Sequence, residues 1–365
     1  MKKIIAMLLV LTMALSLVAC GGGAKDDSKQ VSVFWYDESD VYLSSVRNAL
    51  DKELGAIEGL KFDNQFAGND QAKQMDQIKT AVAGGADLLV VNQVTSGSEE
   101  VAQGILDAAG DIPVVFFNRA IGTDGSELDL LNSNTNVAFI GTDAPAAGHM
   151  QGKMIGDYLL ANYDTVDLNK DGVISYAMMK GDEANMEAVY RTQYGVEDAN
   201  LVLTAAGKPE LAYFDPAANT TYQVDLGGAW SAQAAKDYMD TNFVTFNEGA
   251  GNMIELVICN NDGMAEGVIA SLQEKGYNTT GKHVVPVFGV DATDNAKALI
   301  ADGWMAGTIK QDAEGMATAI AQTVSAVNGG KTPVEALAGL SDERFSLAED
   351  SASKLYVAYA PYTGE

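Results

Sequence analysis

Basic residues are few in this sequence of 365 residues. Lys and Arg together number 23 against 50 Asp and Glu, which gives a formal net charge of -27 at pH 7. Phosphate binding needs a basic surface, so this balance argues against a nucleic-acid partner. The acidity suits a soluble protein outside the cytoplasm that meets cations or neutral ligands, and a role in solubility alone explains it equally well.

Recognisable catalytic motifs are missing. The sequence has no G-x-S-x-G elbow, no Walker loop and no H-E-x-x-H pair. The two histidines, His149 and His283, precede a predicted helix and a predicted strand, where we expect structural roles. Spacing alone does not exclude a hydrolase that uses two carboxylates. The sequence therefore favours a protein that is not an enzyme.

Cysteine is equally scarce, and one of the two cysteines lies at the end of an N-terminal targeting pattern. The segment MKK is basic, and the apolar stretch after it is too short for a comfortable membrane span. The sequence LVAC then resembles the lipobox of bacterial lipoproteins. We predict a signal peptide over 1–19, a lipid on Cys20 and a flexible tether over 20–30; an ordinary secretory signal is the alternative.

Cys259 lies in the apolar stretch ELVICN and is expected to be buried. With Cys20 lipidated, the mature chain can form neither a disulfide nor a cysteine-based metal site. The predicted location is extracytoplasmic, on the outer face of the cell membrane, or periplasmic in a Gram-negative cell.

Short apolar runs alternate with helical patterns along the rest of the chain. Runs such as VSVFWY, DLLVVNQV and IPVVFFN are each followed by a helix-like segment. Continuous apolar strands of this length suit a parallel sheet covered on both faces. The alternation restarts after about residue 165. Two such series predict two doubly wound α/β lobes.

Polar and aromatic side chains follow many of these predicted strands. In doubly wound sheets, ligands bind beyond the carboxyl ends of the strands. The residues at these positions are Asp40, Tyr42, Asn118, Asn185, Glu187, Arg191, Trp230, Asn261, Asp291 and Gln311. Carboxylates, amides and arginine pair with vicinal hydroxyls, and aromatic faces pack on sugar rings. Each Asn or Asp taken alone is equally well explained as a helix cap.

A partial calcium motif lies between the two series. Asp167, Asn169 and Asp171 alternate and Gly172 follows, as at the start of an EF-hand loop. The bidentate carboxylate expected at position twelve is replaced by Met178. An Asx turn without metal is the alternative.

Taken together, these segments resemble the periplasmic sugar-binding proteins of ABC importers, of the galactose/glucose-binding type. The motifs NDQAKQMDQI, PVVFFN, FIGTD, DLNKDG, NNDGMA, PVFGVDA and AGTIKQD follow that family's order over nearly the whole mature chain. The resemblance implies two lobes joined by a three-segment hinge, near 142–146, 308–312 and 345–353. The first lobe would hold 31–143 and 312–346, and the second 144–311 and 347–365.

The resemblance also implies roles for the residues that follow the strands. Asp40, Asn118, Arg191, Asn261 and Asp291 would bind sugar hydroxyls, while Trp230 and Tyr42 would stack on the ring, Tyr42 in place of a phenylalanine. Three positions depart from the family: Asn185 replaces a histidine, Glu187 an aspartate and Gln311 an asparagine. The ligand remains a polyol, but the preferred hexose is open, and a pentose or a glycoside is an alternative.

In this family a distant strand supplies the missing calcium ligand. The implied set is Asp167, Asn169, Asp171, the Val173 carbonyl, Ser175 in place of a glutamine, and Glu255. The ion would be structural.

The expected function is capture of a monosaccharide by a monomer that closes on it and delivers it to an ABC permease. Use of the same closed form by a chemoreceptor is the alternative. A sugar-sensing repressor would instead carry a DNA-binding helix pair where the signal peptide stands.

Overall fold

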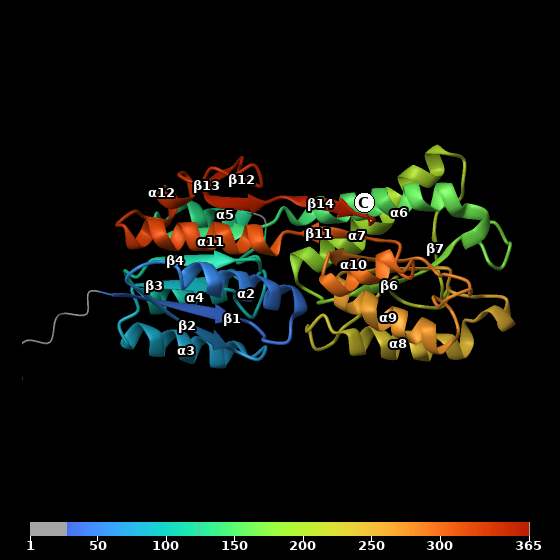
Figure 1. The fold of residues 1–365 in the computed structure, drawn as a ribbon, viewed down its shortest axis with the longest axis horizontal. Coiled ribbons are helices and arrows are strands. Elements are labelled where there is room, and N and C mark those ends of the chain that lie inside the picture. The colour runs from blue at the N-terminus through green and yellow to red at the C-terminus, as the bar shows by residue number, and fades with distance from the viewer. Residues whose placement is uncertain (1–27, 124, 365) are drawn as a thin grey trace, which may run out of the picture.

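In the computed structural model, residues 28–123 and 125–364 are described. They form two α/β lobes arranged side by side along the long axis of the molecule (Figure 1). Each lobe has a seven-stranded, mainly parallel sheet between two helical layers, so the predicted fold class is confirmed. The predicted signal peptide and Cys20 lie outside the described residues. The first strand begins at Lys29 rather than after the predicted tether.

The first sheet is parallel apart from one edge strand, β12. In spatial order its strands are β12 (Phe345–Ala348), β13 (Ser351–Val357), β5 (Val137–Gly141), β4 (Val114–Phe117), β3 (Leu88–Val91), β1 (Lys29–Trp35) and β2 (Leu60–Phe66). One face packs against α2 (Val41–Leu54), α11 (Ala313–Asn328) and α12 (Pro333–Leu337). The other packs against α3 (Gln71–Ala83), α4 (Glu99–Ala109) and α5 (Gly125–Asn132).

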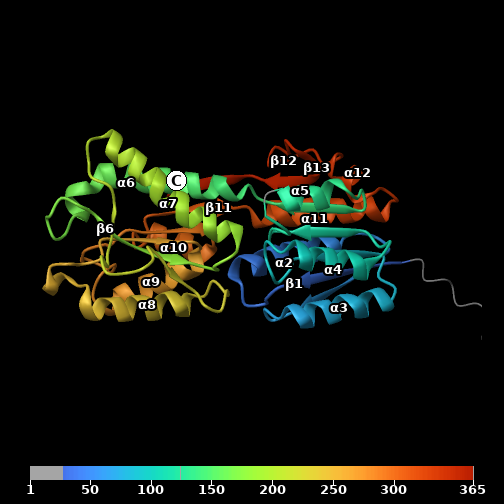
Figure 2. The same cartoon turned by 180° about the vertical axis from the view of Figure 1, so that it is seen from behind.

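The second sheet repeats this plan. Its strands are β14 (Tyr359–Tyr362), β11 (Gly307–Gln311), β10 (Val287–Asp291), β9 (Leu256–Cys259), β6 (Ser175–Lys180) and β7 (Ala212–Tyr213), with β8 (Gln223–Val224) also paired to β6. One face packs against α8 (Ala232–Thr245), α9 (Asp262–Glu274) and α10 (Asp294–Ala301). The other packs against α6 (Ala144–Val166) and α7 (Met186–Ala205), which lie together in the view from behind (Figure 2). A 3-10 turn, η1, spans Glu248–Ala250.

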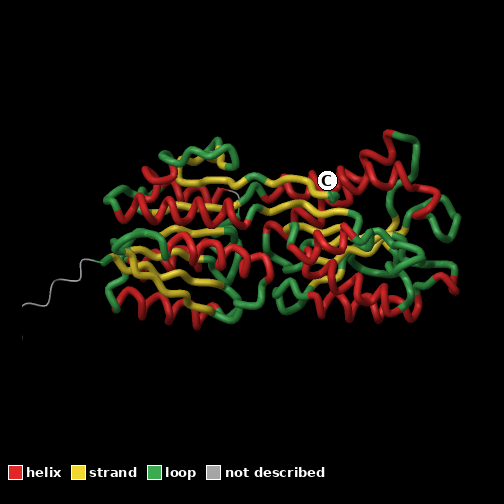
Figure 3. Tube along the Cα trace, viewed as in Figure 1, coloured by secondary structure: helices red, strands yellow, loops and turns green. Residues whose placement is uncertain are grey.

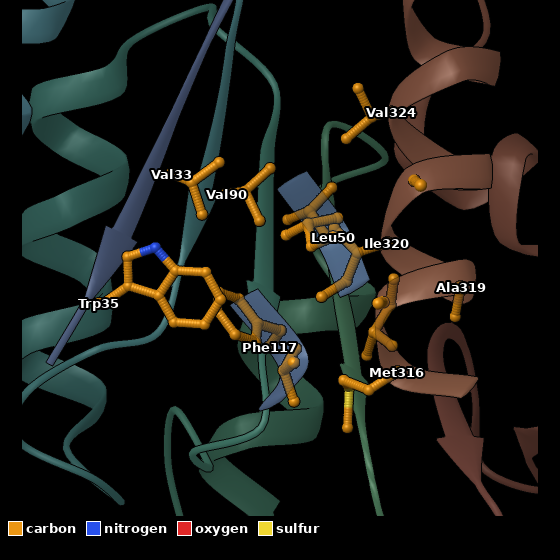
Figure 4. Packing of buried hydrophobic residues seen from close by; sticks show 14 of the residues in the cluster. Val33, Trp35, Leu50, Val90, Phe117, Met316, Ala319, Ile320 and Val324 are labelled. Atoms are coloured by element: carbon orange, nitrogen blue, oxygen red, sulfur yellow. The ribbon is translucent and has the colours of Figure 1, made fainter. Parts of the chain in front are cut away.

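The strands are apolar on both sides because each sheet is covered twice. Along β1, Val33 and Trp35 join the core beneath α11, whereas Phe34 joins the core on the opposite face. Trp35 packs edge-on against Phe117 of β4 with ring centroids 5.1 Å apart. Figure 4 shows this pair facing the α11 residues, Ile320 among them.

Three segments connect the lobes, and the Cα trace shows the last two as extended chain (Figure 3). The first follows β5 at 142–143, the second joins β11 to α11 at Asp312, and the third is Ala358. The predicted third crossover at 345–353, and with it the placement of 347–357 in the second lobe, is wrong. Residues up to Val357 pair within the first sheet, and a single extended run then passes into the second without a turn to mark the change.

Among the helices of the described residues, none combines the length and apolar character needed to cross a membrane.

Candidate functional site

A polar cavity lies between the lobes at the carboxyl ends of strands from both sheets. Its space is about 410 Å³, with the part open to solvent included. Its walls contain all ten residues that the sequence placed after strands, namely Asp40, Tyr42, Asn118, Asn185, Glu187, Arg191, Trp230, Asn261, Asp291 and Gln311. Two further residues, Tyr36 and Arg119, complete the lining. Parallel strands deliver their following loops to one edge, which is why residues so distant in sequence meet here.

The first lobe contributes a stacked pair that sequence reasoning missed. The Arg119 guanidinium lies 3.9 Å from the centre of the Tyr36 ring and is only 3% exposed. The Tyr36 hydroxyl donates to Asp40 at 2.8 Å. Burial raises the pKa of Asp40. Arg119 directly follows Asn118 after β4, so its place at the end of a strand could have predicted that it lines the cavity.

In the second lobe, Arg191 is the centre of a buried hydrogen-bond network. Its Nη2 donates to Glu187 at 2.8 Å, to the Tyr359 hydroxyl at 2.9 Å and to Gln311 at 3.2 Å. Thr142 donates to the other oxygen of Glu187 at 2.6 Å. The network fixes both charged side chains, so little orientational entropy remains to be lost when a ligand arrives.

Asp291 ends β10 with its carboxylate in the cavity. It is 6% exposed and accepts no hydrogen bond from any described residue. Burial, followed by the charge of nearby Asp262, raises its pKa well above the ordinary value. Asp262 itself is held by Thr308 and the Thr293 amide, with a pKa raised to about 7 chiefly by burial. A carboxylate this short of donors is suited to accept hydroxyl groups from a ligand.

Trp230 supplies a flat apolar wall. It adopts a positive φ of 55° directly before the Ser231 cap of α8, which turns the indole into the cavity. The ring lies against Gly181, where a Cβ would come within 2.1 Å of it. Glycine is therefore required at the end of β6 for the indole to take this place.

Three of the cavity residues are also helix caps. Asp40, Asn185 and Asn261 each accept a backbone N–H in the first turn of α2, α7 and α9. The alternative explanation of these residues as caps is thus correct and does not compete with the site. Capping uses one oxygen and fixes the rotamer, while the rest of each side chain faces the cavity.

Several buried polar groups of the cavity have no protein partner. They are the Tyr42 hydroxyl, Nε and Nη1 of Arg119, Nε of Arg191 and Nε2 of Gln311. All can donate a hydrogen bond, while Asp291 can only accept when ionised. A ligand with several hydroxyl groups satisfies both kinds, since each hydroxyl both donates and accepts. Leaving such groups unpaired costs about 1–3 kcal/mol each.

Direct contacts across the opening hold the lobes together. Asn69 of the first lobe donates to the Gly227 carbonyl of the second at 2.6 Å. Arg119 pairs with Asp182 at 3.1 Å, again across the lobes. The structure is therefore the closed arrangement, in which a ligand would be enclosed.

The predicted long-range contact of the 167–175 loop is present. Glu255 Oε1 accepts the amides of Leu168 at 2.7 Å and Asn169 at 3.1 Å, and Oε2 accepts the Ser175 amide at 2.9 Å and its hydroxyl at 3.2 Å. Asp167 Oδ1 is buried without a partner. The oxygens of Glu255 are thus occupied by the protein itself.

The side-chain oxygens of Asn169 and Asp171 likewise accept loop amides two residues on, as Asx turns do. Within residues 28–123 and 125–364, no three or more His, Cys, Asp or Glu side chains are grouped so that they could hold a metal ion. The residue types fit calcium, and in this structure the side-chain oxygens of Glu255, Asn169 and Asp171 accept hydrogen bonds from the loop.

Two lobes that close over a polar cavity are the architecture of a hinged ligand-binding protein. A family model described as "Periplasmic binding protein domain" matches residues 31–332. The chain is 31% identical over 337 residues to the D-galactose/methyl-galactoside binding periplasmic protein of Haemophilus influenzae, covering 92% of each. It is 27% identical to a putative rhizopine-binding protein of Rhizobium meliloti, covering 82% of this chain and 83% of that one.

Solved structures agree on the fold. An ABC transporter solute binding protein from Clostridium phytofermentans with bound β-D-glucose superposes with a TM-score of 0.67 at 21% identity, covering 92% of this chain and 94% of that one. One from Actinobacillus succinogenes with bound D-allose gives 0.66 at 16%, covering 92% and 98%.

The chain belongs to the periplasmic binding protein family. It is an extracytoplasmic, non-enzymatic substrate-binding component of transport, and the resemblance seen in its sequence motifs is confirmed.

Proposed function

We propose that this protein captures a galactose- or glucose-like hexose between its lobes and delivers it to an ABC permease. The observation that carries the proposal is the cavity itself, which combines the unpartnered donors, the Asp291 carboxylate and the Trp230 face. Its H. influenzae relative is named for D-galactose and methyl-galactoside, which supports the same ligand class.

Three residues leave the choice of sugar open. Asn185 cannot be charged, and Glu187 already accepts hydrogen bonds from Thr142, Arg191 and Tyr359. Gln311 turns its Oε1 to Arg191 and leaves its Nε2 free. These differences bear on hydroxyl configuration, so a pentose or a glycoside is the alternative ligand, and sugar sensing for chemotaxis is the alternative role.

The test is a calorimetric and thermal-shift panel of aldohexoses, pentoses and methyl-glycosides on the mature protein. We expect at least one aldohexose to bind with micromolar affinity or better, and to raise the melting temperature. If no monosaccharide binds or stabilises the protein, the proposal fails.

We further propose that Cys20 carries a lipid anchor and that the 167–175 loop takes a structural calcium ion. The buried, unpartnered Asp167 Oδ1 supports the calcium proposal. The residues that would hold the ion are Asp167, Asn169, Asp171, the Val173 carbonyl, Ser175 and Glu255. An ion there would tie the loop to β9, next to which Glu255 lies.

The variant Glu255→Gln distinguishes a role of Glu255 in calcium binding from its role in hydrogen bonding to the loop. The glutamine amide would place a donor against loop amides that now donate to Glu255, so we expect a lower melting temperature even in EDTA. If the loop binds calcium, the ion raises the melting temperature of the wild type, and the variant loses that increase. A calcium response equal in both proteins would contradict the role of Glu255. Glu274→Gln, a change at an exposed glutamate, is the control.

A further inference from the structure

A second cavity lies beside the first, against the crossover segments. Its space is about 1010 Å³, against about 410 Å³ for the first, with the part open to solvent counted in both. Residues from both lobes line it: Phe139, Asp143 and Tyr356 on or near the first sheet, and Met186 and Tyr190 on α7. The site described above does not use this space.

The two cavities share walls. Asn118 and Glu187 line both of them. Asn118 ends β4 with a positive φ of 61° and accepts a hydrogen bond from Asn92 through its Oδ1, so its orientation is set. A ligand seated against Trp230 and Asp291 would therefore have one side next to the second cavity.

The walls of the second cavity combine apolar residues with four carboxylate side chains and one lysine. Lys354 is the one cation among the described residues that line it; it is paired with Glu127 and lies 5.2 Å from the Tyr356 ring. Asp143 occupies the N-cap position of α6, but its side chain makes no hydrogen bond to the helix. Asp350 adds a further carboxylate. Free carboxylates with a partly buried aromatic ring repel anions and suit a neutral polyhydroxylated group.

We propose that the second cavity is a subsite for a second glycosyl unit, so that the protein binds a disaccharide as well as a monosaccharide. The inference rests on the proposed function. The linkage would pass between Asn118 and Glu187, with the second ring facing Tyr356 and its hydroxyls donating to Asp143. The second ring would add contact area with the protein, and this gain would offset the greater entropy cost of ordering a longer ligand.

Calorimetry on the mature protein tests the subsite with galactose, glucose, lactose, melibiose, maltose and cellobiose. Ala144→Trp fills the second cavity from the start of α6, and Ala161→Trp puts the same side chain at an exposed position of that helix. We expect the affinity of the wild type for at least one disaccharide to lie within about tenfold of its affinity for the component monosaccharide. Ala144→Trp should weaken the binding of that disaccharide by about tenfold or more. Monosaccharide affinity should stay within about twofold in both variants. Asp143→Ala, which removes only an exposed side chain, should weaken the disaccharide by about threefold or more even if the tryptophan variant does not fold.

Monosaccharide binding without any disaccharide binding would overturn the subsite and leave the proposed function intact. Equal losses for monosaccharide and disaccharide in Ala144→Trp or Asp143→Ala would overturn it as well. If no sugar binds wild type, the proposed function itself fails, and the subsite with it.

Discussion

Replacing Asp291 by alanine should lower sugar affinity by about 100-fold or more, because a charged hydrogen-bond acceptor is worth about 1.5–3 kcal/mol for each hydroxyl it serves. The carboxylate is buried and lacks a protein donor, so the free protein loses nothing that holds it together. Its raised pKa shows that ionisation is disfavoured in the fold. The melting temperature of the ligand-free variant should therefore not fall. Calorimetry and thermal melts measure the two quantities on one sample.

The pH dependence provides an internal check. Sugar hydroxyls donate to the ionised form of Asp291, so wild-type affinity should fall as the pH is lowered through its raised pKa. Asp291→Asn should bind weakly with a flatter pH profile. Asp294→Ala, a fully exposed carboxylate three residues on, is the matched control and should bind as wild type does. Wild-type affinity in Asp291→Ala would remove this residue from the site.

Trp230→Ala should weaken sugar binding by about 30-fold or more, since the variant loses the buried apolar face as well as the ring stacking, together about 2 kcal/mol or more. The variant should stay folded, because Trp230 stands in a loop at the cleft rather than in a strand. Trp230→Phe keeps a smaller ring and should recover part of the affinity.

Intrinsic fluorescence gives a second readout for the same residue. The chain has three tryptophans; Trp35 lies in the hydrophobic core of the first lobe, and Trp304 is partly buried and packs against the core of the second. The change in emission on sugar binding should disappear in Trp230→Ala and persist in Trp304→Phe. A sugar-dependent change of wild-type size in Trp230→Ala would show that the indole does not face the ligand.

The architecture and most of the cavity follow from the sequence by one physical rule. Because both sheets are parallel, the residues after their strands gather at one edge, and Asn118, Trp230 and Asp291 could be placed together without any knowledge of tertiary contacts. Arg119 was not predicted, although it follows β4 directly after Asn118.

Other features depend on long-range geometry that a local pattern does not carry. The passage of the last strand run from one sheet to the other at Ala358 has no turn residue to mark it. The family resemblance predicts that Glu255 contacts the 167–175 loop, but it does not predict that the loop amides of Leu168 and Ser175 are its hydrogen-bond donors.

The hydrogen-bond network around Arg191 connects the ligand cavity to all three crossover segments. Gln311 and Tyr359 each stand beside a crossover and Thr142 lies within another, and all three are hydrogen-bonded to Arg191 or to its partner Glu187. Bending any crossover therefore disturbs the groups that hold the ligand. Sugar affinity is therefore coupled to the geometry of the crossovers, and changes at Thr142, Gln311 or Tyr359 will alter how tightly the sugar is held.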